Sequence, residues 1–225
     1  MTSFLVIFFL AILCLVNASS SSSATATSTL KSCDKKEISW KLGFPKTRGL
    51  GLSLCGEGTR SKGPIKVYTV ALYFDKNGIV NAVKKIGSLK GKKASELASS
   101  RDFENAIING NIGRHIVLKM SRNVSGQTMA GAIADSVSPR MKGKDSTQLK
   151  DFQNILLTSL KDGAKSGMEL SFEGTSSLTV KINGNKKGEV RSPTLCKAFL
   201  DVYVGKDCVS SSLKSSLANA VASWL

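Results

Sequence analysis

Hydrophobic and polar residues alternate along three short segments, a pattern typical of half-buried β-strands with one apolar face. The apolar members are Ile116, Leu118 and Met120 in the first segment, Met168, Leu170 and Phe172 in the second, and Leu178, Val180 and Ile182 in the third. Residues 173–177 form a short polar connection between the last two segments, which predicts an antiparallel hairpin. Asn183-Gly184 then begins the next turn.

A further strand is predicted from Val67 to Phe74, because this run is rich in β-branched and aromatic residues and has turn residues on both sides. One face of the strand carries Tyr68, Val70, Leu72 and Phe74. We expect residues 56–64 to form a glycine-rich turn that places Arg60 directly before the strand. A guanidinium and a phenol above an apolar surface suit a ligand with a carboxylate head and a hydrocarbon tail, although an ordinary structural role for both residues stays open.

Apolar residues recur at helical spacing in four later segments. The first two helices are predicted over residues 129–137 and 149–160. Ser192-Pro193 supplies an N-cap and a first-turn proline for a third helix that Gly205 ends, and Ser210 caps a last helix. The fold class is therefore α+β, with an antiparallel sheet and a layer of helices packed on one face. A ligand would lie between the two layers.

The first 32 residues are expected to lie outside the folded domain. Leu5 to Val16 is a nearly unbroken apolar run followed by small residues, which predicts a cleaved signal peptide over residues 1–18. A membrane anchor is the alternative, but the run is shorter than the ~20 residues that a bilayer requires. Residues 19–32 form a Ser/Thr-rich linker or a transit segment, and residues 33–225 form the domain. We expect the secretory pathway or the extracellular space, with a plastid reached by the secretory route as the alternative.

The chain is strongly basic, with 32 Lys and Arg residues against 16 Asp and Glu residues and a formal net charge of +16. Its cationic residues are scattered along the sequence, and no zinc-finger, RNA-recognition or helix-turn-helix motif accompanies them. We therefore expect no specific nucleic-acid partner. A basic surface that attracts anionic ligands or anionic membranes accounts for the charge.

Four cysteines follow the predicted signal peptide: Cys33, Cys55, Cys196 and Cys208. In an oxidising compartment this even number suggests disulfides, in one of three pairings that the sequence leaves open. The chain has no Cys-x-x-Cys motif and only one histidine, His115, so we predict neither a metal nor a cofactor. Asn123 begins a glycosylation sequon.

From Gly43 to the C-terminus the chain resembles the chalcone-isomerase fold family. The segments that carry the resemblance are Gly58-Thr59-Arg60 leading into the strand at residues 65–73, residues 125–140 with Ser125-Gly126-Gln127 at their start, and residues 188–205. The turn and strand are more similar to the fatty-acid-binding members than to the flavonoid enzymes. The resemblance implies that Arg60 and Tyr68 hold a ligand carboxylate.

The same resemblance implies a different chemistry for the enzymes of the family, which use a tyrosine and a lysine on the helix after the Gly-Gln pair. The corresponding residues here are Met129 and Ala132, and a nearby asparagine position is Ser136. A thioether cannot donate a hydrogen bond to a developing oxyanion. The strand threonine of the enzymes corresponds to Tyr68, or to Thr69 if the alignment shifts by one residue.

We predict a non-catalytic binder of a fatty acid or a similar carboxylated lipid, with no catalytic residue. The predicted ligand contacts are Arg60, Tyr68, Thr69 and Met129, and Arg48 is the alternative to Arg60. Two other functions stay open. One is an isomerase of the chalcone isomerase type, an intramolecular lyase acting on a chalcone-like substrate, and the other is an anion- or membrane-surface-binding protein without a pocket. The oligomeric state is not predicted.

Overall fold

The computed structural model describes residues 41–49, 51–141 and 146–225 of the 225-residue chain. The predicted signal peptide, the Ser/Thr-rich segment and Cys33 lie outside the described residues. Within the described residues, no helix is both long enough and apolar enough to cross a bilayer.

The described residues form a seven-stranded sheet in which every neighbouring pair of strands is antiparallel and the spatial order follows the chain from β1 to β7. The strands are β1 (Thr47–Arg48), β2 (Leu52–Lys62), β3 (Ile65–Phe74), β4 (Arg114–Met120), β5 (Glu169–Glu173), β6 (Ser177–Ile182) and β7 (Asn185–Arg191). The hairpin predicted between β5 and β6 is confirmed. Asn183 and Gly184 have positive φ angles of 48° and 81°, as a tight turn between β6 and β7 requires.

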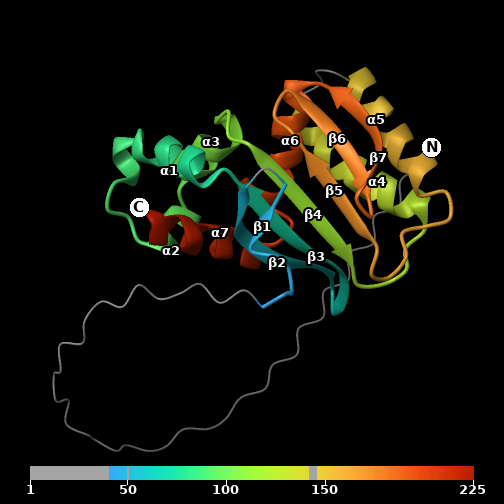
Figure 1. The fold of residues 1–225 in the computed structure, drawn as a ribbon, viewed down its shortest axis with the longest axis horizontal. Helices are drawn as coiled ribbons and strands as arrows, with labels where there is room; N and C mark the ends of the chain where they lie inside the picture. The colour runs from blue at the N-terminus through green and yellow to red at the C-terminus, as the bar shows by residue number, and fades with distance from the viewer. Residues whose placement is uncertain (1–40, 50, 142–145) are drawn as a thin grey trace, which may run out of the picture. The chain divides into compact units, whose positions relative to one another are not determined.

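The helices are α1 (Lys76–Lys84), α2 (Ala94–Ala98), α3 (Arg101–Asn109), α4 (Gly126–Val137), α5 (Ser146–Ser159), α6 (Pro193–Val204) and α7 (Ser211–Trp224), with short 3₁₀ turns at Gly87–Leu89 and Ser138–Met141. The predicted caps are present, because the Ser192 hydroxyl accepts from the backbone N–H of Leu195 and the Ser210 hydroxyl accepts from that of Leu213. Figure 1 shows α5 beside β6 and β7, and α7 beside β2.

The main core lies between the sheet and the helices, as the α+β prediction required. Its centre contains an aromatic group in which Phe199 of α6 stacks against Phe152, Phe172 and Tyr203, with ring centroids 4.5–5.7 Å apart. The opposite face of the sheet has a smaller cluster formed by Phe44, Leu54, Ala71, Tyr73 and Val117, covered by the segment before β1 rather than by a helix.

The prediction of a turn over residues 56–64 is wrong, because β2 continues to Lys62 and only Gly63-Pro64 form the turn. The glycines of β2 instead allow a helix to approach the strand. A Cβ atom on Gly58 would lie 2.7 Å from the backbone nitrogen of Leu213 in α7, and one on Gly56 would lie 3.2 Å from that of Leu217. β2 is therefore a strand whose small residues make room for α7.

Candidate functional site

The β2–β3 hairpin places Arg60 and Tyr68 directly opposite each other in the antiparallel register. A register shift follows Arg60, so that Ser61 pairs with Lys66. Side chains directly opposite on one sheet face lie close together, with Cβ atoms typically about 5 Å apart. The pairing brings a guanidinium beside a phenol at the end of the apolar row on β3.

These two residues line a cavity of about 640 Å³ between the sheet and the helices. Its apolar wall consists of Ile65, Val67, Val124, Met129, Ala132, Ile133, Val137, Phe199, Val202 and Val209. Its polar lining consists of Arg60, Lys62, Tyr68, Arg122, Asn123, Thr128, Ser136 and Tyr203. Such a volume lies within the range of about 300–1,000 Å³ that is typical of small-molecule sites.

The cavity has a deep end and an open end. Tyr68, Tyr203 and Phe199 are buried, with Tyr203 only 1% exposed and Tyr68 only 8% exposed. Lys62 and Arg122 are exposed at the other end. A ligand that enters therefore passes charged residues before it reaches the aromatic interior.

The electrostatic character of the lining is cationic. Arg60, Lys62 and Arg122 contribute positive charge, and no aspartate or glutamate belongs to the lining. The Nη1 atom of Arg60 donates to the backbone carbonyl of Val209 at 3.2 Å, and among the described residues Arg60 has no carboxylate partner. The remaining donors of the guanidinium are available to an anionic ligand.

The two phenols at the deep end interact with each other. Burial raises the pKa of Tyr68, while a hydrogen bond with Tyr203 and the nearby charge of Arg60 oppose this rise. Burial also raises the pKa of Tyr203 well above its ordinary value, and its hydrogen bond with Tyr68 adds to the rise. The two phenols therefore lie close enough to influence each other's ionisation. The raised pKa of Tyr68 keeps its hydroxyl protonated at neutral pH.

Three of the four residues predicted as ligand contacts, Arg60, Tyr68 and Met129, line this cavity. Thr69 does not, because successive strand residues point to opposite faces of the sheet. Its hydroxyl donates to the backbone carbonyl of Lys119 at 3.4 Å instead. The structure thus places Thr69 on the face away from the helices.

Arg48, the alternative arginine, also lies away from the cavity. Its two terminal nitrogens donate to the two carboxylate oxygens of Glu169 at 2.5 Å each, and its guanidinium carbon lies 5.8 Å from the centre of the Tyr73 ring. The hydrogen bonds with Glu169 raise the pKa of Arg48, although burial opposes this. Arg48 therefore links β1 to β5 on the outer face of the sheet.

The described cysteines, Cys55, Cys196 and Cys208, are free thiols rather than members of a disulfide. All three predicted pairings require at least one bridge among these cysteines, so the expectation of a fully paired set is not met. Burial raises the pKa of Cys55 to about 12 and that of Cys196 to about 11. No group of three or more metal-ligating side chains occurs within the described ranges.

Sequence reasoning missed several cavity residues, above all Tyr203, Lys62 and Arg122. Tyr203 belongs to α6, whose sequence pattern predicted only a helix with one apolar face. Lys62 is the last residue of β2 and Arg122 follows the end of β4. Neither the lysine nor the arginine at these positions carries a sequence pattern that distinguishes it from other surface cations. Only the three-dimensional pairing of β2, β3 and β4 brings them to one opening.

A second hollow, of about 590 Å³, lies between α3, the 3₁₀ turn at Ser138–Met141 and α6. Its arginines and its acids are already paired with one another or with neighbouring residues. Arg140 contacts Asp201 at 3.1 Å, and Glu104 binds both Arg101 and Lys214. An anion in this hollow would therefore find no unpaired arginine comparable to Arg60.

The described residues form a two-layer α+β fold with a cavity lined by β2, β3, α4 and α6. The model of a protein family described as "Chalcone isomerase-like" matches residues 97–218. The chain belongs to the chalcone isomerase-like family.

Two relatives and one solved structure are similar to this chain. It is 26% identical to fatty-acid-binding protein 1 of Arabidopsis thaliana over 90% of this chain and 76% of the relative. It is 28% identical to chalcone isomerase-like protein 1 of Humulus lupulus over 73% of this chain and 79% of the relative. The crystal structure of the Arabidopsis thaliana fatty-acid binding protein AtFAP1 shares the fold, with a TM-score of 0.70, 24% identity and coverage of 80% of this chain and 93% of that chain.

Proposed function

We propose that this protein binds a fatty acid or a similar carboxylated lipid in the cavity between the sheet and the helices, without catalysing a reaction. The observation that carries the proposal is the position of Arg60, which has no carboxylate partner among the described residues and lies beside Tyr68 in an otherwise apolar cavity. The relative named for fatty-acid binding supports the proposal at the level of the family.

The polar end of the site matches a carboxylate in both charge and hydrogen bonding. Arg60 supplies positive charge and several N–H donors in one plane, and Tyr68 supplies a neutral O–H donor, because its raised pKa keeps it protonated at neutral pH. Charge-assisted hydrogen bonds of this kind contribute about 1.5–3 kcal/mol each. The carboxylate would therefore bind where these two residues meet.

The apolar wall matches a hydrocarbon tail. Val67, Met129, Ile133 and Phe199 surround the space next to Tyr68 without presenting a charged atom. Each buried methylene contributes about 0.8 kcal/mol, so a long chain gains more from this wall than a short one. Affinity should thus rise with chain length until the cavity is filled.

The proposal is tested by native mass spectrometry of the purified protein, with extraction and identification of any lipid that remains bound. Isothermal titration with a soluble saturated fatty acid then measures the affinity. One molecule bound per chain, with release of the lipid by organic extraction, supports the proposal. Failure to bind fatty acids of any length would refute it.

A further inference from the structure

Three segments that are distant in the sequence meet at the open end of the cavity. They are residues 59–67 around the β2–β3 turn, residues 119–125 at and after the end of β4, and residues 164–168 before β5. The backbone N–H of Ser121 donates to the carbonyl of Val67 at 2.9 Å, and that of Gly167 donates to the carbonyl of Met120 at 2.8 Å. Backbone pairing between Val124 and Ala164 completes the connection.

These three segments, which we call the cavity rim, concentrate positive charge. The rim contains six cations and no acid: Arg60, Lys62, Lys66, Lys119, Arg122 and Lys165. The acids next to it along the chain are Glu57, which accepts from the backbone N–H groups of Lys41 and Leu42, Asp162, which follows Lys161, and Glu169, which is bound by Arg48. The excess of positive charge at this end is therefore local as well as a property of the whole chain.

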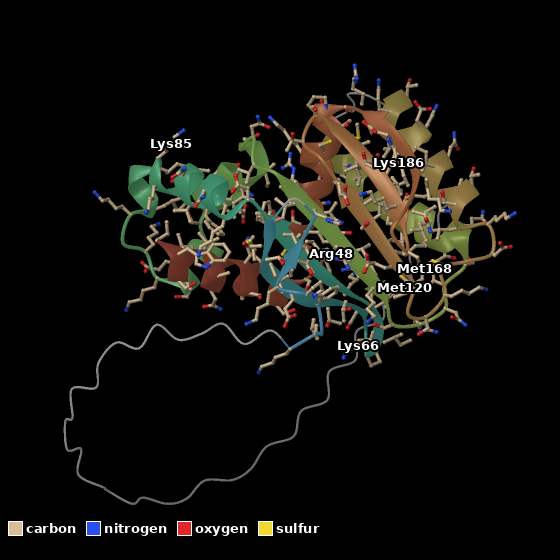
Figure 2. The ribbon with its side chains drawn as sticks, viewed as in Figure 1. Arg48, Lys66, Lys85, Met120, Met168 and Lys186 are labelled. Carbon is tan, nitrogen blue, oxygen red and sulfur yellow. The ribbon has the colours of Figure 1, made fainter. Side chains whose placement is uncertain are left out.

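The rim also exposes a large apolar side chain at its tip. Ile65 is 47% exposed, the highest value among the large hydrophobic residues that the structure describes as exposed. It follows the Gly63-Pro64 turn, has Lys66 as its neighbour and belongs to the cavity lining. Figure 2 shows Lys66 at this tip, with Met120 and Met168 close to it and Lys85 at the far end of the folded part.

We propose that the cavity rim docks onto the surface of a bilayer that contains anionic lipids. The exposed cations of the rim, Lys62, Lys66, Lys119, Arg122 and Lys165, lie against the lipid phosphates, and Ile65 inserts among the headgroups. An exposed apolar side chain surrounded by Lys and Arg is suited to the membrane interface, where apolar insertion and attraction to anionic lipids act together.

Charge decides between a bilayer and a second copy of the chain as the occupant of this surface. Two rims that approached each other would bring twelve cations together without a counter-charge. An anionic bilayer instead neutralises the rim and accepts Ile65 at the same time. If the protein binds a lipid in its cavity, as proposed above, docking in this orientation would turn the opening toward the membrane.

The experiment is flotation of the purified protein with phosphatidylcholine vesicles, with and without phosphatidylserine. We expect binding only to the vesicles that contain phosphatidylserine. The decisive comparison is Lys66→Glu against Lys85→Glu, because both replace an exposed lysine and both lower the net charge by two. Neither lysine belongs to the cavity lining.

Each cation near an anionic surface contributes about fivefold to binding, so Lys66→Glu should weaken vesicle binding by roughly 25-fold. Lys85→Glu should have little effect, because charge interactions are screened beyond about 10 Å. Ile65→Ser should also weaken binding, by removal of the inserted side chain. Equal losses for the two lysine variants would overturn the proposal, because attraction would then depend on net charge alone, and absence of vesicle binding would overturn it directly.

Docking and fatty-acid binding are separable in this design. Ala132→Trp places an indole in the cavity without changing the charge, so it should abolish fatty-acid binding measured without vesicles and leave flotation unchanged. Lys66→Glu should do the opposite. Loss of flotation in Ala132→Trp would show that the vesicles bind through the cavity and would contradict docking by the rim.

Discussion

Arg60 and Tyr68 face each other across the β2–β3 hairpin, eight residues apart in the sequence and directly paired in the sheet. This pairing fixes the distance between a guanidinium and a phenol by backbone hydrogen bonds rather than by side-chain contacts. Tyr203 of α6 lines the same cavity from the helical side. The polar end of the cavity is therefore defined by two layers of the fold at once.

Substitution of Arg60 by alanine should weaken the binding of a long-chain fatty acid by one to two orders of magnitude, because charge-assisted hydrogen bonds contribute about 1.5–3 kcal/mol. Tyr68→Phe should have a smaller effect, since it removes one hydroxyl and keeps the ring. Isothermal titration measures both. Lys85→Ala is the control for net charge, and an affinity of Arg60→Ala equal to that of the unchanged protein would disprove the assignment of the carboxylate site.

The protein should not accelerate the cyclisation of chalcones appreciably. The cavity wall has Met129 and Ala132 where the resemblance to the isomerases implies a tyrosine and a lysine, and neither side chain stabilises a developing negative charge. The measurement is the decay of chalcone absorbance with and without protein. A large protein-dependent rate that is lost in Arg60→Ala would instead identify an isomerase.

The strands β3 to β6 and the helices from α4 onward were predictable because their signals are local. Alternation of apolar residues identified β4, β5 and β6, and the serine caps identified the starts of α6 and α7. β2 was missed because Gly56 and Gly58 weaken the strand pattern, and their purpose is visible only when α7 lies against them. Its glycines are explained by a contact between residues more than 150 positions apart.

The candidate site was predictable only in part, for a similar reason. Arg60 and Tyr68 lie in a short segment with a recognisable pattern, but Tyr203 joins them only through the packing of α6. Thr69 was predicted as a ligand contact because the sequence alignment left a shift of one residue open, but it does not line the cavity. In a strand, such a shift moves a side chain to the opposite side of the sheet.

Gly58→Ala should destabilise the fold by on the order of 1–3 kcal/mol, because its new methyl group would lie 2.7 Å from the backbone of Leu213 and force α7 away from β2. Gly131→Ala is the matched control. Gly131 lies within α4, and a Cβ atom there would meet nothing within 4 Å, so the change should raise stability by up to about 1 kcal/mol. Urea unfolding followed by circular dichroism measures both. If Gly58→Ala did not lower the free energy of unfolding relative to Gly131→Ala, the result would contradict the close packing of α7 on β2.

Among the described cysteines, Cys208 should react first with a thiol reagent. Cys55 and Cys196 are buried, and burial raises their pKa values to about 12 and about 11, so little thiolate forms at pH 8. Cys208 is partly exposed. Alkylation under native conditions, followed by peptide mass spectrometry, gives the order of labelling. Rapid labelling of Cys55 would show that α7 and β2 separate readily in solution.

Tyr73 should make the fold sensitive to alkaline pH. Burial raises its pKa to about 12, whereas an unfolded tyrosine has a pKa of about 10. Between these values the unfolded state releases a proton that the folded state keeps, so the free energy of unfolding falls as the pH rises from about 10 to about 12, by on the order of 2 kcal/mol.

Tyr73→Phe separates this effect from the titration of the lysines and the other tyrosines. The substitution removes the hydrogen bond from the Tyr73 hydroxyl to the carbonyl of Pro45, which measures 2.9 Å, so stability at pH 8 should fall by about 1 kcal/mol. Its stability should then decline less steeply than that of the unchanged protein above pH 10, because phenylalanine has no proton to release. Urea unfolding at a series of pH values tests this expectation, and parallel pH profiles for the two proteins would show that Tyr73 titrates equally in the folded and unfolded states.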